Sequence, residues 1–281
     1  YTTDLAEFRA FLSREGLGDL VDADARAIRA WLAWLHDRKL AKSESVGADA
    51  LILDLEDSVA PAQKSAARSR VRDFLLAHPQ RPTTQLWVRI NPLDTPDALA
   101  DLVAVIGAQP NGIMQPKTRC ADDVARLAHY LDAFEAQHNL EAGRICILPV
   151  ATETPAALFS LGDFARCGPR LKGLTWGAED LSAAIGATGN KEADGSWTQP
   201  FQLARSLCLF GANAAGVAAI DTLYDDIRNP EDLRTACLEA SRDGFVCKLA
   251  IHPDQVAIIN ECFLPSAAEL AHAAAVVALF A

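Results

Sequence analysis

Short apolar runs alternate with longer amphipathic stretches along the chain from about residue 48 onward. Seven runs rich in β-branched or other apolar residues are predicted as strands, at residues 50–55, 86–90, 112–115, 145–151, 171–176, 217–220 and 246–250. Each run is too continuously apolar for a sheet with one face in water. We therefore expect parallel strands that are covered on both faces.

The stretches between these runs have helical periodicity. Apolar residues recur at helical spacing in two clear cases, namely Leu99, Leu102, Val103 and Ile106, and then Val124, Leu127, Ala128 and Leu131. Strands and helices that alternate every 30 residues or so indicate repeated βαβ units. Seven strands are one short of a closed barrel, so an open doubly wound sheet remains an alternative. No G-x-G-x-x-G follows any of the strands, which disfavours a dinucleotide-binding sheet.

The first 45 residues have a different pattern. Leu5, Phe8, Phe11 and Leu12 form one helical stripe, and Ile28, Trp31, Leu32 and Leu35 form another. This pattern predicts a helical hairpin where a barrel would begin with a strand. We expect residues 1–45 to be an atypical helical N-terminal segment, and residues 46–281 to be the (β/α) domain.

Composition and charge narrow the classes of function. Half of the 281 residues are hydrophobic and the net charge is −11, so a large core is expected and a broad positive surface for nucleic acid or anionic membranes is not. The seven cysteines form no C-x-x-C pair, which favours reduced thiols. No signal pattern opens the chain, and the apolar stretch 267–281 is too short to span a bilayer. A cytoplasmic location is expected.

Polar residues follow the predicted strands, at the end where parallel α/β folds place their ligands. They are Glu56 and Asp57 after the first strand, Arg89 at the end of the second, Lys117 after the third, Glu153 after the fourth and Asp180 after the fifth, with Asp221 and Lys248 at the sixth and seventh. Any one of these is more often a helix cap or a structural ion pair than a catalyst.

Several carboxylates that converge on one edge repel each other and need a cation. Glu153 and Asp180 end successive strands and can share one divalent ion. Mg²⁺ suits them, because it takes one or two carboxylates and leaves its other positions to water and substrate. No C-x-x-C or H-x-x-x-H pattern argues for zinc.

Six ordered blocks resemble the citrate lyase β-subunit-like family, the HpcH/HpaI aldolase group. They are Leu51-Ile-Leu-Asp-Leu-Glu-Asp-Ser-Val-Ala-Pro with Lys64 and Arg68, Val88-Arg-Ile-Asn-Pro, Gly112-Ile-Met-Gln-Pro-Lys, Glu153-Thr, Gly177-Ala-Glu-Asp-Leu, and Gly244 through Ile251-His-Pro-Asp-Gln to Phe263-Leu-Pro-Ser. The resemblance covers residues 47 to 269, and six blocks in order are far more specific than any one motif.

The resemblance implies a TIM-type (β/α)₈ barrel in which Glu153 and Asp180 hold Mg²⁺ and Arg89 binds the substrate. It implies a carbon–carbon lyase that cleaves a 3-hydroxy-acyl thioester, such as citryl-CoA or malyl-CoA, into a 2-oxo acid and an acyl thioester on CoA or a carrier protein. Glu56 and Asp57 are assigned to proton transfer or water positioning, and Lys117 to a supporting charge at the substrate. We also expect a homo-oligomer, a trimer or a hexamer.

The chain departs from the family pattern in three places. The family's first strand is replaced by residues 4–43, which resemble the N-terminal helical module of tyrosine recombinases; Cys247 stands where glycine is usual; and the C-terminal lid of the longer acyl-CoA lyases is not present by Ala281. Three other functions therefore remain: a thioester hydrolase on the same scaffold, a catalytically silent scaffold or regulatory subunit, and a DNA-associated protein. Retained Arg89, Glu153 and Asp180 favour the lyase.

Overall fold

The computed structural model of the chain describes residues 47–81 and 83–280. Its strands are β1 (Ala50–Asp54), β2 (Gln85–Arg89), β3 (Gly112–Gln115), β4 (Cys146–Pro149), β5 (Gly173–Thr175), β6 (Ala218–Asp221) and β7 (Cys247–Lys248). Its helices are α3 (Lys64–Ala77), α4 (Pro96–Val105), α5 (Ala121–Gln137), α6 (Pro155–Leu158), α7 (Glu179–Ile185), α8 (Gln199–Ala214), α9 (Pro230–Asp243), α10 (Pro253–Phe263) and α11 (Ala267–Phe280), with 3₁₀ turns η1 (Pro61–Gln63), η2 (Ile106–Ala108) and η3 (Leu161–Arg166).

Strand and helix alternate along the domain, and all seven predicted strands are present within two residues of their predicted ends. The predicted helical hairpin at residues 1–45 lies outside the described residues. None of the helices that the structure describes is long and apolar enough to cross a membrane.

Every strand pairs in parallel with its neighbours in chain order. Hydrogen bonds join β1-β2-β3-β4 into one sheet and β5-β6-β7 into a second. Two isolated parallel bridges, Ile147 with Leu171 and Val150 with Thr175, connect the two sheets. The prediction of repeated βαβ units is therefore confirmed, and in the described part of the chain no strand pair joins β7 back to β1.

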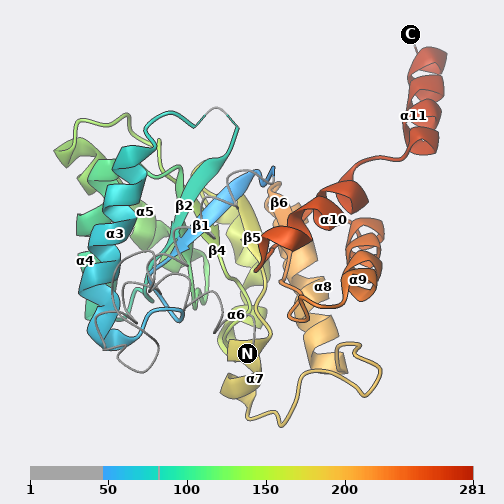
Figure 1. The fold of residues 1–281 in the computed structure, drawn as a ribbon, viewed down its shortest axis with the longest axis horizontal. Helices are drawn as coiled ribbons and strands as arrows, with labels where there is room; N and C mark the ends of the chain where they lie inside the picture. Colours follow the sequence, from blue (N-terminus) through green and yellow to red (C-terminus); the bar gives the residue numbers. More distant parts are fainter. Residues whose placement is uncertain (1–46, 82, 281) are drawn as a thin grey trace, which may run out of the picture. The chain divides into compact units, whose positions relative to one another are not determined.

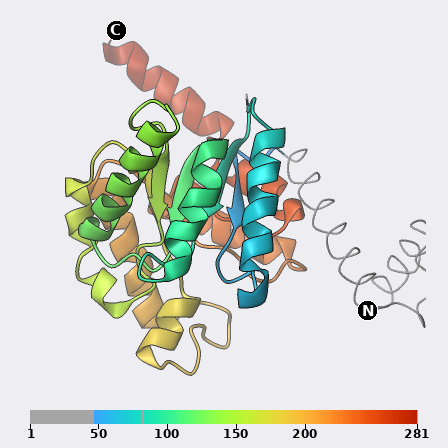
Figure 2. The ribbon, with the colours of Figure 1, turned by 90° about the vertical axis from the view of Figure 1, so that its left-hand side faces the viewer.

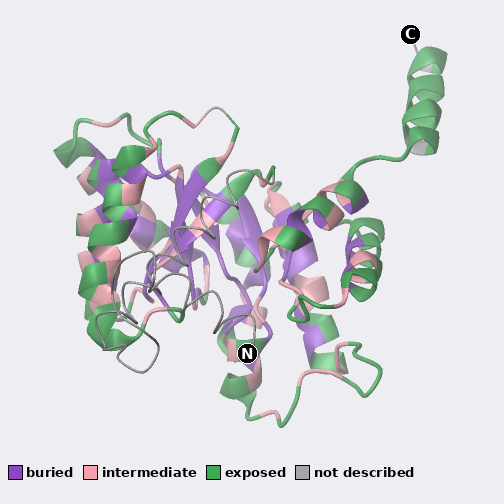
Figure 3. Cartoon of the chain, in the orientation of Figure 1, coloured by how far each residue is buried: buried purple, intermediate pink, exposed green. Residues whose placement is uncertain are grey.

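Helices α3, α4 and α5 lie side by side over the first sheet (Figures 1 and 2). The strands are largely buried and the helices expose their outward sides (Figure 3), as expected for a parallel sheet covered by crossover helices. Proline begins α4, α6, α9 and α10. This residue suits the first turn of a helix, where its missing N–H is not needed and its fixed φ favours helix.

The register places alternate residues on opposite faces of the strands. Asp54 pairs with Arg89, and Arg89 with Met114, so these three residues share one face. Val150 continues that face to Thr175 across the bridge between the sheets. We call this the inner face, because Asp221, on the opposite face of β6, hydrogen-bonds to Arg205 of helix α8. The inner face carries Arg89, which the sequence singled out at the end of β2, and Asp54 opposite it on β1.

A glycine below these polar residues makes room for an indole ring. A Cβ atom built on Gly112 would lie 2.6 Å from Cη2 of Trp87, on the neighbouring strand. Trp87 is buried, so its ring cannot move aside without disturbing the packing around it.

We expect Gly112→Ala to lower the free energy of unfolding by about 1–3 kcal/mol, the usual cost of overpacking a core. The matched control is Gly162→Ala, because nothing lies within 4 Å of a Cβ built there. Urea denaturation of both variants and the wild type measures the difference. Equal midpoints for the two variants would show that the ring does not need this space.

Candidate active site

The guanidinium of Arg89, at the end of β2, is held by the carboxylate of Asp54 on the neighbouring strand β1. Its Nε and Nη2 donate to the two oxygens of Asp54 at 2.8 and 2.6 Å, a bidentate geometry that fixes the plane of the guanidinium. Burial opposes both charges, but the ion pair with Asp54 still raises the pKa of Arg89. Hydrogen bonds from Arg89 and Ser58 hold the pKa of the Asp54 carboxyl below its usual value. The remaining nitrogen, Nη1, is left for other contacts.

That nitrogen faces Glu56. Nη1 of Arg89 lies 3.1 Å from Oε2 of Glu56, but the geometry does not make a hydrogen bond, and Oε2 is a buried oxygen without a hydrogen-bond partner. Glu56 is almost fully buried, and burial is the main cause that raises its pKa. An unsatisfied buried carboxylate oxygen beside an arginine marks a place where a substrate atom or a water can be accommodated.

Lys117 connects three carboxylates. Its Nζ lies 2.7 Å from Oε1 of Glu56 and 3.3 Å from Oδ1 of Asp180, while its backbone N–H donates to Oε2 of Glu153. Its φ of 51° lies in the left-handed region, which non-glycine residues seldom adopt and which concentrates at functional sites. These carboxylates raise the pKa of the lysine, so it is a permanent cation.

Among the residues that the structure describes, no side-chain cation forms an ion pair with Glu153. It is 5% exposed, and burial, together with the nearby charges of Asp180 and Glu56, raises its pKa to about 8. The strand after it approaches closely: a Cβ atom on Gly177 would lie 3.0 Å from Cγ of Glu153. Glycine at this position leaves room for the carboxylate.

Asp180 comes from the first turn of α7 and is about one-third exposed. Glu153 and Asp180 therefore form a carboxylate pair, with one member buried and one open to solvent. Within the described residues no group of three or more His, Cys, Asp or Glu side chains gathers to hold a metal. A pair suits Mg²⁺, which needs one or two carboxylates, and the charge of the ion would offset both the burial and the repulsion that raise the pKa of Glu153.

The structure brings together five of the six predicted site residues. Glu56, Arg89, Lys117, Glu153 and Asp180 are linked through the contacts above. Asp57 lies at the margin, because its side chain is 62% exposed and its carboxylate is 3.6 Å from Lys117 Nζ. No role was predicted for Asp54. The signal available in the sequence was an acidic residue at the carboxyl end of the first predicted strand.

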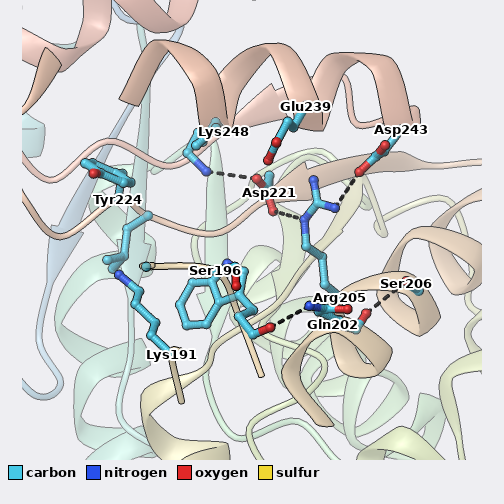
Figure 4. A pocket seen from close by; sticks show the side chains of 14 residues that line it. Lys191, Ser196, Gln202, Arg205, Ser206, Asp221, Tyr224, Glu239, Asp243 and Lys248 are labelled. Atoms are coloured by element: carbon cyan, nitrogen blue, oxygen red, sulfur yellow. Dashed lines mark hydrogen bonds and ion pairs between the residues drawn. The ribbon is translucent and has the colours of Figure 1, made fainter. Parts of the chain in front are cut away.

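Asp221 and Lys248 do not join this cluster. Both lie on the opposite face of β6 and β7, where Asp221 accepts from Lys248 Nζ at 2.8 Å and from Arg205 Nε at 3.1 Å. Figure 4 shows Arg205 between Asp221 and Asp243 in a separate cavity of about 370 Å³. The cavity's lining cations, Lys191, Arg205 and Lys248, are all in ion pairs, so the structure does not place Asp221 and Lys248 with the other polar strand-end residues.

Comparison with known proteins identifies relatives of this arrangement. A model of the HpcH/HpaI aldolase/citrate lyase family matches residues 28–253. A citrate lyase subunit beta-like protein of Mycobacterium tuberculosis is 35% identical over 88% of this chain and 83% of its own length. An L-malyl-CoA/beta-methylmalyl-CoA lyase of Rhodobacter capsulatus is 33% identical over 85% of this chain and 78% of its own.

The structural likeness agrees with the sequence likeness. The crystal structure of protein CitE from Mycobacterium tuberculosis, in complex with magnesium, acetoacetate and coenzyme A, has a TM-score of 0.70 and 34% identity, over 86% of this chain and 82% of that one. This likeness confirms the prediction of a TIM-type barrel, and the family match confirms the resemblance of the six sequence blocks. The chain belongs to the HpcH/HpaI aldolase/citrate lyase family.

Proposed function

We propose that this protein is a Mg²⁺-dependent carbon–carbon lyase that cleaves a 3-hydroxy-acyl-CoA thioester into a 2-oxo acid and an acyl-CoA. The observation that carries the proposal is that buried Glu153 and Asp180 both contact Lys117, whose ammonium also binds Glu56 next to Arg89. The relatives support it, since they include lyases of CoA thioesters and a complex with magnesium and coenzyme A.

Glu153 and Asp180 are the proposed metal ligands. When bound, Mg²⁺ supplies Lewis-acid polarisation of the hydroxyl and carboxylate oxygens of the hydroxy acid. Lys117 holds both ligands in place, through its N–H to Glu153 and its ammonium near Asp180. Its charge also faces the region where a substrate carboxylate would lie.

Glu56 is the proposed proton carrier. Its Oε2, which has no hydrogen-bond partner among the described residues, accepts the proton of the substrate hydroxyl, the carbon–carbon bond breaks, and the electron pair of that bond becomes the enolate of the acyl thioester. The same proton then passes to the enolate carbon, which gives the acyl-CoA product. Burial raises the pKa of Glu56 and so brings it closer to the range in which a carboxyl can both accept and return a proton.

Arg89 is the proposed donor to the enolate oxygen. Because Asp54 occupies Nε and Nη2, the guanidinium is fixed before substrate binds, and Nη1 remains to meet negative charge as it develops. Such a preorganised donor acts mainly on the transition state, since the thioester oxygen of the substrate is nearly neutral.

Product analysis tests this function directly. The purified protein is incubated with Mg²⁺ and a panel that includes citryl-, malyl- and citramalyl-CoA. A lyase forms one 2-oxo acid for each thioester consumed and releases no free thiol. A thioester hydrolase releases free CoA thiol and no 2-oxo acid, and that outcome would replace the lyase with the alternative on the same scaffold. A protein that consumes no member of the panel would support the silent scaffold.

Metal binding gives a prediction that does not depend on turnover. Calorimetric titration of the wild type with Mg²⁺ should show one site, and Asp180→Ala should lose it. Saturating the site at 100 times its Kd should stabilise the wild type by about 2.7 kcal/mol. The matched control is Glu179→Gln, because Glu179 accepts from Asn190 and makes no contact with the cluster in the described residues. Equal binding by Asp180→Ala and the wild type would remove Asp180 from the metal site.

Substitution of Arg89 should affect turnover more than affinity. We expect Arg89→Ala to lower kcat about a hundredfold or more, as loss of one oxyanion donor typically does, with a much smaller change in KM. Arg89→Lys keeps the charge, but it loses the fork that pairs with Asp54 and should also be impaired. Steady-state kinetics on the cleaved thioester measures both constants. A raised KM with an unchanged kcat would make Arg89 a carboxylate clamp.

A further inference from the structure

A polar network joins the loops that follow β1 and β2, and among the described residues it makes no hydrogen bond to Glu153 or Asp180. Lys64, the first residue of α3, extends its ammonium to the carbonyl oxygens of Leu55 at 3.0 Å and Glu56 at 3.2 Å. A third acceptor is Oδ1 of Asn91. The three N–H donors of one ammonium therefore have three acceptors, two of which belong to the turn that presents Glu56.

Asn91 ties this turn to the strand end that carries Arg89. Its Nδ2 donates to the carbonyl of Leu55 at 2.9 Å and to Oδ2 of Asp101 at 2.7 Å, and its backbone N–H donates to the same Oδ2 at 2.7 Å. Asn91 is two residues beyond Arg89 and is buried, as is Asp101 of α4. The two loops that follow β1 and β2 are thus held together by side chains of the covering helices.

From this network we infer that Lys64 is a positioning residue for the reaction, because it fixes the turn that presents the Glu56 carboxylate to Arg89 and Lys117. The inference rests on the proposed function for its kinetic consequence and on geometry alone for its structural one. A satisfied buried polar network rigidifies the groups it joins, and catalytic groups must hold their position to within about 0.5 Å.

The turn does not depend on Lys64 to fold. The carbonyl of Glu56 also accepts from the N–H of Val59 at 3.0 Å, and the carbonyl of Leu55 also accepts from Asn91. In Lys64→Met, which keeps the unbranched stem, each carbonyl therefore retains one donor. The turn can form without the ammonium, but it then loses the side-chain hydrogen bonds from Lys64 that tie it to the start of α3.

The kinetic test compares Lys64→Met with a control substitution at Arg81. Lys64 begins α3, and Arg81 lies in the loop between α3 and β2. Arg81, at the opposite end of the strands, also caps carbonyls of two loops, those of His78 at 2.7 Å and Gln109 at 2.7 Å. We expect Lys64→Met to lower kcat about tenfold or more, with KM and Mg²⁺ affinity changed less than about threefold. Arg81→Met should lower the melting temperature at least as much and leave kcat within about twofold. Equal effects of the two variants on kcat would overturn the inference.

A double-mutant cycle separates positioning from a general structural role. If Lys64 acts through Glu56, adding Lys64→Met to Glu56→Gln should cost little further activity, because the group it positions is already gone. If the two losses multiply, Lys64 acts by another route and the inference is wrong.

Crystal structures of the wild type and Lys64→Met decide the geometric part without any assay. The inference expects residues 55–58 to shift and the 2.7 Å contact of Glu56 with Lys117 to lengthen or break. A turn that superposes on the wild type with this contact intact would contradict it. Should the wild type cleave no thioester, the proposed function fails, while this comparison still supports or refutes the positioning role.

Discussion

The site depends on a balance of charge at one edge of the strands. Four carboxylates, Asp54, Glu56, Glu153 and Asp180, lie there, and in the part of the chain that the structure describes two side-chain cations, Arg89 and Lys117, form ion pairs with them. With all four carboxylates ionised, four negative charges face two positive charges, which leaves an excess of two. The raised pKa of Glu153 follows from that excess and from burial, and one divalent cation would offset it.

The charged side chains of the site differ in how far their charges are compensated. Asp54 and Arg89 compensate each other through two hydrogen bonds, so the guanidinium is oriented before any substrate arrives. Lys117 is shared by Glu56 and Asp180, and the donor to Glu153 in the described part of the chain is the backbone N–H of Lys117. The carboxylate with the least compensation is therefore the one best suited to a metal ion. Helices α3 and α4 support the arrangement through Lys64 and Asp101, which bind Asn91 and, for Lys64, the backbone carbonyls of Leu55 and Glu56.

The sequence predicted the strands well, because runs of buried apolar residues are the direct consequence of a sheet covered on both faces. Because these runs are apolar throughout, the sequence does not indicate which face of the sheet each strand residue occupies. Asp221 and Lys248 end their strands as Arg89 does, yet they point toward α8 and not to the site. Where both faces are apolar, no alternation in the sequence distinguishes inner from outer positions.

Other features required coordinates for different reasons. The backbone at Lys117 is left-handed, but the residue is not a glycine, so the sequence does not indicate this conformation. In this conformation Lys117 contacts Glu153 through its N–H and Glu56 through its side chain. The pairing of Arg89 with Asp54 is a matter of register between strands 35 residues apart, which local patterns do not contain. Glu56 and Asp57 looked equivalent in the sequence, but one is buried and the other is exposed.

The most direct test of this charge balance is a crystal structure of the protein soaked with Mn²⁺. The anomalous scattering of Mn²⁺ distinguishes the ion from a water molecule. The account predicts one anomalous peak shared by carboxylate oxygens of Glu153 and Asp180, at distances of about 2.0–2.3 Å. A peak at another site would contradict this prediction. So would the lack of any peak at Glu153 and Asp180 at saturating Mn²⁺.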